Sequence, residues 1–217
     1  ALLDSYKFTL ALLKASESHG AMVVNGQVIG IMSSGGQVTG VKLNDREIGC
    51  DAVIVAMGPW SNSASNWLEV DVPVKPLKGQ IIHLEKLDPP LGYHLAGPGQ
   101  VVSKRDGFVW VGATEEEKEF DLELTTGARN ELMDRSVKMV PSLDGHPIVR
   151  QTACLRPISP DRLPIIGPVP GLDGTYLATA AEKKGILIGP AIANAISDLV
   201  ITGETDIPIA SFQITRF

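Results

Sequence analysis

The sequence lacks the short motifs that mark common nucleotide-binding, hydrolytic and metalloprotease sites. Its 217 residues contain no complete G-x-G-x-x-G, no Walker sequence, no G-x-S-x-G and no H-E-x-x-H. Gly97-Pro98-Gly99 begins like a dinucleotide-binding turn, but the third glycine is absent and Pro98 has no backbone N–H to offer a phosphate. We therefore find no segment suited to cradling nucleotide phosphates.

Cysteine and histidine are scarce and widely spaced. The only cysteines are Cys50 and Cys154, which form no C-x-x-C pair, and the four histidines stand at positions 19, 83, 94 and 146. This spacing excludes a disulfide framework and gives no pattern of metal ligands. We expect buried thiols, ordinary histidines and no metal site.

Basic residues form no cluster. The chain has 19 Lys and Arg against 25 Asp and Glu, a net charge of −6, and no basic run that could follow a nucleic-acid backbone. No apolar run approaches the roughly 20 residues that cross a bilayer, and the first residues do not resemble a signal peptide. We therefore expect a soluble, cytoplasmic protein with a small-molecule ligand and neither nucleic acid nor membrane as a partner.

What the sequence does contain indicates a compact fold rich in turns. Apolar residues make up 44% of the chain, with 22 Gly and 15 Pro. Asp4 can cap a helix that ends at His19-Gly20. Turns at Gly35-Gly36 and Asn44-Asp45 punctuate the segments after it, which have the composition of strands: 21–24, 27–32, 38–43 and 51–56.

The composition changes near residue 74. Residues 74–84 predict a bent strand around Pro76 and Gly79, and segments 100–103 and 108–112 predict a hairpin. A helix should start at Thr126 and stop before Pro141, and a last apolar helix should run from Gly185 to Gly203.

Three segments, in this order, carry the strongest functional signal. The first is Val53-Ile-Val-Ala-Met-Gly-Pro-Trp60-Ser61, a buried strand that ends in a glycine turn. The second is Leu155-Arg156-Pro157, and the third is Gly185-Ile-Leu-Ile-Gly189-Pro-Ala191. Together they resemble the FAD-dependent D-amino-acid oxidase superfamily, especially its glycine oxidase and sarcosine oxidase-like members. The resemblance covers nearly the whole chain.

The resemblance implies a mixed α/β or α+β fold. Residues 1–72 and 154–217 would be a partial, Rossmann-like FAD-binding domain, interleaved with an antiparallel substrate-binding domain of residues 73–153. FAD is then the implied cofactor of the full-length protein, and this chain alone should hold it weakly or not at all because it has no pyrophosphate turn. The cofactor-binding residues implied by the resemblance are Val28, Ala56, Gly58, Trp60, Gly185, Ile186 and Leu187.

Two positively charged residues are candidates for contact with substrate. Arg156 stands in an apolar stretch, where a guanidinium needs a partner such as the carboxylate of a substrate. A structural salt bridge to Asp161 or to another carboxylate is the alternative. Lys183 is a weaker candidate, for which a solvated side chain is an equal alternative.

The implied activity is oxidation of an amino acid or secondary amine, by hydride transfer to flavin N5 that leaves an imine. Gln100 stands where glycine oxidases carry a tyrosine that contacts the substrate, and Lys183-Lys184 replaces a common Arg-Asn pair. The resemblance therefore does not identify which amino acid or amine is the substrate. One alternative is a flavin-free binding module with the same fold. Another follows from the start at Ala1 without Met, which would suit a fragment of a longer protein. Uncovered apolar faces in such a fragment would favour a homo-oligomer.

Overall fold

The computed structural model describes residues 3–217, which fold as two compact units. Unit 1 comprises the residues up to Ala56, Ser63–Val72 and Pro164–Phe217. Unit 2 comprises Met57–Asn62 and Pro73–Leu163. The chain thus enters and leaves unit 2 twice, as an interleaved arrangement requires.

Unit 1 begins with helix α1, Ser5–Ser18. The Asp4 side chain caps it by accepting a hydrogen bond from the Lys7 N–H, and the chain turns away at Gly20 with a φ of 96°. The predicted helix is confirmed. Its side chains, however, are all at least partly exposed, so the helix buries no residue fully within the described chain.

Two small sheets follow in unit 1. The first is an antiparallel sheet in the order β1-β2-β3, made of Val28–Ser34, Gln37–Leu43 and Glu47–Gly49. Gly35 and Gly36, both with positive φ, form the turn between its first two strands. The sequence-based interpretation was wrong at residues 21–24, which form no strand, and it missed β3.

The second sheet has the order β10-β11-β4, made of Ile165–Pro168, Thr175–Thr179 and Val53–Val55. Strands β11 and β4 are parallel, with Leu177 paired to Val55, whereas β10 and β11 are antiparallel. The sheet therefore joins segments more than 100 residues apart in the sequence. Residue ranges 1–72 and 154–217, which the resemblance placed in one domain, thus meet in this sheet.

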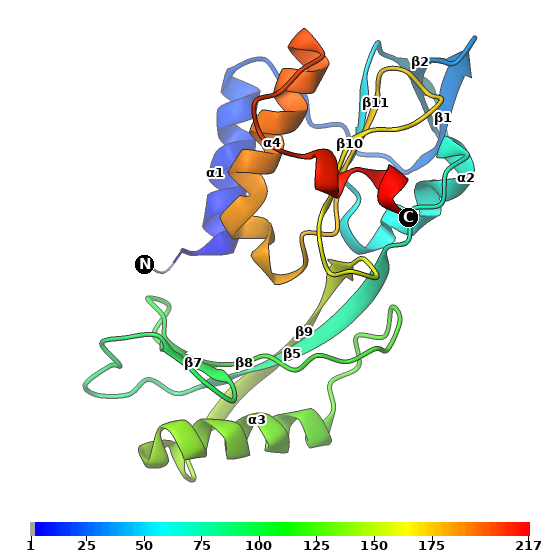
Figure 1. Cartoon of the computed structure of the whole chain (residues 1–217). Helices are drawn as coiled ribbons and strands as arrows, with labels where there is room; N and C mark the ends of the chain where they lie inside the picture. The colour runs from blue at the N-terminus through cyan, green and yellow to red at the C-terminus, as the bar shows by residue number, and fades with distance from the viewer. Residues whose placement is uncertain (1–2) are drawn as a thin grey trace. The chain divides into compact units, whose positions relative to one another are not determined.

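The remaining helical elements of unit 1 lie around these sheets. Helix α4, Gly185–Thr202, is orange in Figure 1, and its Ala195 and Ile196 pack with Ile166 of β10 and with Ile209. The shorter helices are α2 Ser65–Leu68, η3 Glu182–Lys184, η4 Ala210–Phe212 and η5 Ile214–Arg216. The 3-10 helix η1, Gly58–Ala64, belongs to unit 2 up to Asn62 and to unit 1 from Ser63.

Helix α4 is unusually apolar. Together with the turn before it, Glu182–Thr202, it is long and apolar enough to cross a membrane by length and composition alone. The sequence-based statement that no segment approaches that length needs this correction. Only 11% of its apolar window is buried within the described residues, and the buried side chains of α4 are Ala195 and Ile196, which pack against the unit 1 sheet.

Unit 2 is built on a five-stranded antiparallel sheet in the order β6-β7-β8-β5-β9. The strands are β5 Lys75–Leu84, β6 Leu95–Ala96, β7 Gln100–Ser103, β8 Val109–Gly112 and β9 Ile148–Ile158. The predicted hairpin is β7-β8. The longest pairing joins β5 to β9, from Lys75 opposite Ile158 to Leu84 opposite Ile148.

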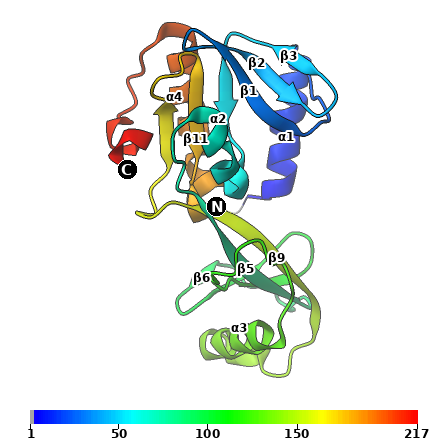
Figure 2. The same ribbon diagram turned by 90° about the vertical axis from the view of Figure 1, so that its right-hand side faces the viewer.

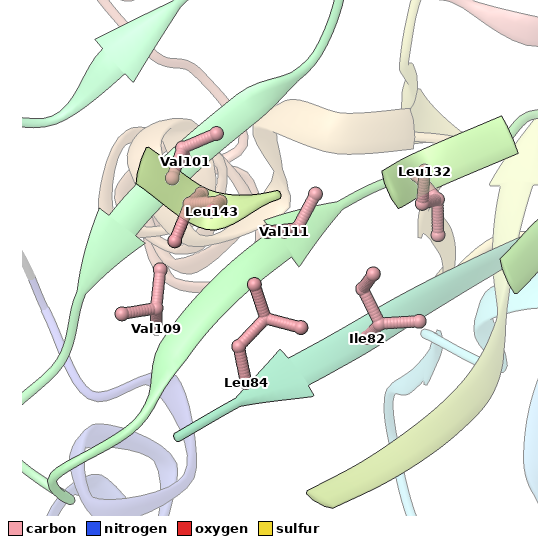
Figure 3. Close-up of a cluster of buried hydrophobic side chains, with 7 residues drawn as sticks. All are labelled: Ile82, Leu84, Val101, Val109, Val111, Leu132 and Leu143. Atoms are coloured by element: carbon pink, nitrogen blue, oxygen red, sulfur yellow. The ribbon is translucent and has the colours of Figure 1, made fainter. Parts of the chain in front are cut away.

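One face of this sheet is covered by helix α3, Thr126–Met139, as Figures 1 and 2 show from two sides. Thr125 caps the helix by accepting a hydrogen bond from the Ala128 N–H, and the 3-10 turn η2, Pro141–Leu143, follows it. Figure 3 shows the core between helix and sheet, whose buried side chains are Ile82, Leu84, Val101, Val109, Val111, Leu132 and Leu143.

The boundary of unit 2 differs from the expected one. We expected residues 154–163 to belong with the first unit, but they group with the second, because β9 remains paired with β5 as far as Ile158. Met57–Asn62 also group with unit 2. A strand pairing that extends past a motif leaves no mark in composition, so the sequence placed this boundary too early.

Candidate functional site

The unit 2 sheet has one face free of the helical layer. Side chains alternate along a strand, so the residues next to Ile82 and Leu84 point away from α3. In the register of β5 with β9, Leu77 pairs with Arg156 and Gly79 pairs with Cys154. These residues therefore belong to the face opposite α3, and this face carries the arginine predicted to bind substrate.

Within the part of the chain that the structure describes, Arg156 is held by a single acceptor. Its Nη1 donates a hydrogen bond of 3.3 Å to the backbone carbonyl of Thr114. Among residues 3–217 the guanidinium forms no ion pair, and its Nε and Nη2 donate to no protein acceptor. An edge with two parallel donors is thus left for a ligand, which suits a carboxylate.

The alternative partner of Arg156 is engaged elsewhere. The Asp161 carboxylate accepts hydrogen bonds from the Ser159 hydroxyl at 2.9 Å and from the Leu163 N–H at 3.0 Å. The Asp161 carboxylate therefore stabilises the turn that follows β9. The salt bridge from Arg156 to Asp161, left open by the sequence, does not form.

Behind Arg156, two polar side chains of β5 are fully buried. Lys78 donates to Asp121 at 2.7 Å. Gln80 donates to Glu116 at 2.9 Å, and its side-chain oxygen accepts from the Gln151 side chain at 2.8 Å. Buried polar groups with several partners fix the geometry of their surroundings. This network fixes the segment that follows β8, which includes the Thr114 carbonyl.

Glu116 is part of this network rather than of a solvated loop. Partial burial would raise the pKa of its carboxyl, but hydrogen bonds from Thr114 and Gln80 and the charge of Lys78 outweigh burial and hold the pKa below its ordinary value. The hydrogen bond from Lys78 is also the main cause of the lowered pKa of Asp121. Although Glu116 belongs to an acidic run, residues 115–119, its carboxylate is thus part of the polar network around Gln80.

His83 lies on the same face as Arg156 but farther along β5. It is 1% exposed, shares a 3.2 Å hydrogen bond with the Thr152 hydroxyl and accepts one from Arg150 at 3.4 Å. Burial lowers the pKa of His83, and the positive charge of Arg150 lowers it further. With Trp110 packed edge-on at 4.3 Å between ring centroids, His83 is a neutral core residue.

In unit 1, several residues expected at the cofactor gather at one edge of a sheet. Because β4 and β11 are parallel, their carboxyl ends lie at the same edge. Ala56 directly follows β4, and the turn into α4 follows β11. Ligands of open α/β sheets bind beyond the carboxyl ends of the strands. Ala56 and the start of α4 therefore share the location where such a ligand binds.

The turn into α4 has an unusual backbone. Ala180 and Glu182 both adopt left-handed conformations, with φ of 59° and 49°. Such conformations cost energy in residues other than glycine and are concentrated at functional sites. Lys184, the N-cap of α4, makes no capping hydrogen bond with its side chain, and Leu187 is 80% exposed.

The other predicted site residues are spread over both units. Val28 begins β1, in the other sheet of unit 1, and Lys183 is an exposed residue of η3. Gly58 and Trp60 belong to unit 2, where Trp60 stacks on Phe120 with ring centroids 6.0 Å apart. Among residues 3–217, no group of His, Cys, Asp and Glu is arranged to hold a metal ion.

Comparison with known proteins identifies the family. The profile of the FAD dependent oxidoreductase family, DAO, matches residues 1–199. The chain belongs to this family. The resemblance noted in the sequence is thereby confirmed, and so is the mixed α/β fold with antiparallel sheets.

The DAO chain is similar to glycine oxidase of Pseudomonas putida, with 33% identity over 187 residues, which cover 86% of this chain and 51% of that protein. It is also 32% identical to hydrogen cyanide synthase subunit HcnC of Pseudomonas protegens, over 99% of this chain and 52% of that one. The chain thus spans about half the length of these curated relatives.

Solved structures give the same fold. Glycine oxidase from Geobacillus kaustophilus superposes with a TM-score of 0.89 at 26% identity, over 96% of this chain and 57% of that one. L-proline dehydrogenase from P. horikoshii superposes with a TM-score of 0.93 at 23% identity, over 99% of this chain and 60% of that one.

Proposed function

We propose that this chain forms the substrate-binding part of an FAD-dependent oxidoreductase that oxidises an amino acid or a secondary amine bearing a carboxylate. The observation that carries the proposal is the state of Arg156. Its guanidinium is half-buried on the face of the sheet opposite α3, and among residues 3–217 it is bonded to one carbonyl, with two donors left for a ligand. A bidentate contact there would fix the carboxylate and hence the orientation of the substrate's α-carbon.

The start of α4 fits the flavin. A helix N-terminus carries a partial positive charge and N–H groups without intrahelical partners, and the side chain of the N-cap residue Lys184 does not cap this one. Gly185, Ile186 and Leu187 would therefore stabilise negative charge at the N1 and C2 carbonyl region of the ring. Bound FAD would supply the redox chemistry by accepting a hydride from the substrate carbon at N5, which leaves an imine. The chain's own residues bind the substrate and orient it.

Support for FAD comes from the family and from the edge shared by Ala56 and α4. We propose that the full-length protein binds FAD, whereas residues 1–217 alone bind it weakly because they lack a pyrophosphate turn. We further propose that the cofactor contacts Val28, Gly58 and Trp60, and that Lys183 provides a second positive charge near the substrate. The proposal also includes a cytoplasmic location and a homo-oligomeric state.

The test is anaerobic reduction of the flavin in the FAD-loaded full-length protein, followed by visible absorbance. Glycine, sarcosine and larger amino acids should be compared with methylamine and dimethylamine, which lack the carboxylate. We expect bleaching by at least one compound that bears a carboxylate and none by its decarboxylated counterpart. Equal bleaching by both members of a pair would refute the carboxylate anchor. A full-length protein that gains no flavin absorbance with FAD would favour a flavin-free binding module.

A further inference from the structure

The Arg156 side chain crosses a strand to reach its acceptor. Arg156 lies on β9, which pairs with one edge of β5. Along the other edge of β5 runs the segment after β8, where the Thr114 N–H donates to the Gln80 carbonyl at 3.1 Å and the Glu116 N–H donates to the Lys78 carbonyl at 2.9 Å. A bond from Arg156 to Thr114 therefore spans β5, and the residue beneath the guanidinium is Gly79.

Gly79 is required for space and not for its backbone conformation. It sits in a regular strand without positive φ, so an alanine fits the backbone. A Cβ at this position, however, would overlap Nη1, Nη2 and Cζ of Arg156, which are its three nearest atoms. Because those atoms are the mobile end of a long side chain, the guanidinium would move while the sheet stayed in place.

Thr114 supplies the acceptor through an exchange of hydrogen bonds. In a regular ladder the Gln80 N–H would donate to the Thr114 carbonyl. Here it donates to the Thr114 hydroxyl at 2.9 Å, and that hydroxyl donates in turn to Glu116 at 2.5 Å. The hydroxyl thus replaces the carbonyl in the ladder, and the carbonyl is left to accept from Arg156.

We propose that Gly79 and Thr114 are positioning residues, which hold the guanidinium flat across β5 so that its Nε and Nη2 donors bind the substrate carboxylate together. The inference rests on the proposed role of Arg156. Neither residue touches the substrate in this scheme. Gly79 leaves the space in which the planar group lies, and Thr114 fixes one of its corners, so the two remaining donors are already oriented when a carboxylate arrives.

The central test is Gly79→Ala in the FAD-loaded full-length protein. We expect KM for a carboxylate-bearing substrate to rise roughly 10- to 100-fold, because displacement of a binding group by about 1 Å has effects of that size. Flavin content and melting temperature should stay near those of the wild type. Gly49→Ala is the matched control, since Gly49 is also a strand glycine, but a Cβ there meets nothing closer than 3.7 Å.

A second pair of variants tests the hydrogen-bond exchange. Thr114→Val removes the hydroxyl, so the Gln80 N–H should donate to the carbonyl of residue 114 instead. That carbonyl is then no longer left for Arg156 alone, and KM should rise. Thr114→Ser keeps the hydroxyl and should restore the wild-type KM. This pair also keeps the inference testable should Gly79→Ala fail to fold.

A double-mutant cycle separates this inference from the function on which it rests. In an Arg156→Ala background, Gly79→Ala should change KM no further. If Arg156→Ala raises KM and Gly79→Ala does not, or if Gly79→Ala acts equally with and without Arg156, the positioning role is wrong. If Arg156→Ala itself leaves KM unchanged, the carboxylate anchor fails and the positioning role fails with it.

A readout independent of turnover is the NMR signal of the Arg156 Nε–H group during titration with acetate. It should shift in the wild type and in Gly49→Ala, but not in Gly79→Ala. A shift of equal size in Gly79→Ala would overturn the positioning role.

Discussion

Replacement of Arg156 is the perturbation with the largest expected effect on substrate binding. Among residues 3–217 the guanidinium makes one hydrogen bond, to the Thr114 carbonyl at 3.3 Å, and forms no ion pair. Its removal should therefore disturb folding little. What Arg156→Ala removes is the bidentate contact proposed for the substrate carboxylate.

The magnitude follows from two charge-assisted hydrogen bonds, each of which contributes about 1.5 to 3 kcal/mol. Arg156 is only half-buried, so solvent screens part of this interaction. We expect a loss of about 2 to 4 kcal/mol in binding of the carboxylate. Since about 1.4 kcal/mol corresponds to a factor of ten, KM should rise roughly 30- to 1,000-fold.

The assay is steady-state oxidation of a carboxylate-bearing substrate by the FAD-loaded full-length protein, with flavin absorbance as the measure of cofactor content. Arg156→Lys should recover only part of the loss, because an ammonium restores the charge but cannot present two parallel donors. Arg135→Ala is the control, since Arg135 pairs with Glu131 on the surface of α3. An unaltered KM in Arg156→Ala would refute the reasoning. The enzyme would then bind its substrate without a contact between Arg156 and a carboxylate.

Two further predictions concern stability and use urea unfolding of the chain. Leu132→Ala should lower the free energy of unfolding by about 2 to 5 kcal/mol, because Leu132 is 0% exposed in the core of unit 2 and its truncation leaves a cavity. Leu122→Ala, at a side chain 52% exposed, should change it by less than about 0.5 kcal/mol, and equal effects would contradict the assigned core. The lowered pKa of Glu116 means that its carboxylate stabilises the fold above its ordinary pKa and that this stability is lost as the pH falls through the lowered value. Glu116→Gln should therefore reduce the loss of stability between neutral and acidic pH, and an unchanged pH profile would contradict the network around Gln80.

The elements with strong local signals were predicted well. Helix α1 is capped by Asp4 and ends before Gly20, and α3 starts at Thr126, as local capping and turn chemistry indicated. Local signals failed where pairing with another segment decides the structure. Residues 21–24 have a suitable composition but find no partner strand, whereas β3, Glu47–Gly49, is short and forms only because it pairs with β2.

The same distinction applies to the candidate site. Arg156 could be chosen from the sequence because a charge within an apolar stretch needs a partner, and the family resemblance pointed to the same residue. Nothing local to Arg156 indicates Thr114 or Gly79. Their roles depend on the register of β9 against β5 and on the path of the chain after β8. A strand register pairs residues that are distant in sequence, so the register of β9 against β5 could not be predicted from the sequence of either strand alone.

Gly79 illustrates why the function of a strand glycine depends on its neighbour across the sheet. From the sequence it indicated a kink in a strand, a role in backbone conformation. In the fold, β5 remains paired with β9 on both sides of Gly79 without a break in register there, so no kink requires a glycine. The absent Cβ instead makes room for a side chain that arrives from the neighbouring strand. A glycine in a β-sheet can therefore shape a binding site without contacting the ligand, through the position that it allows a longer neighbour to take.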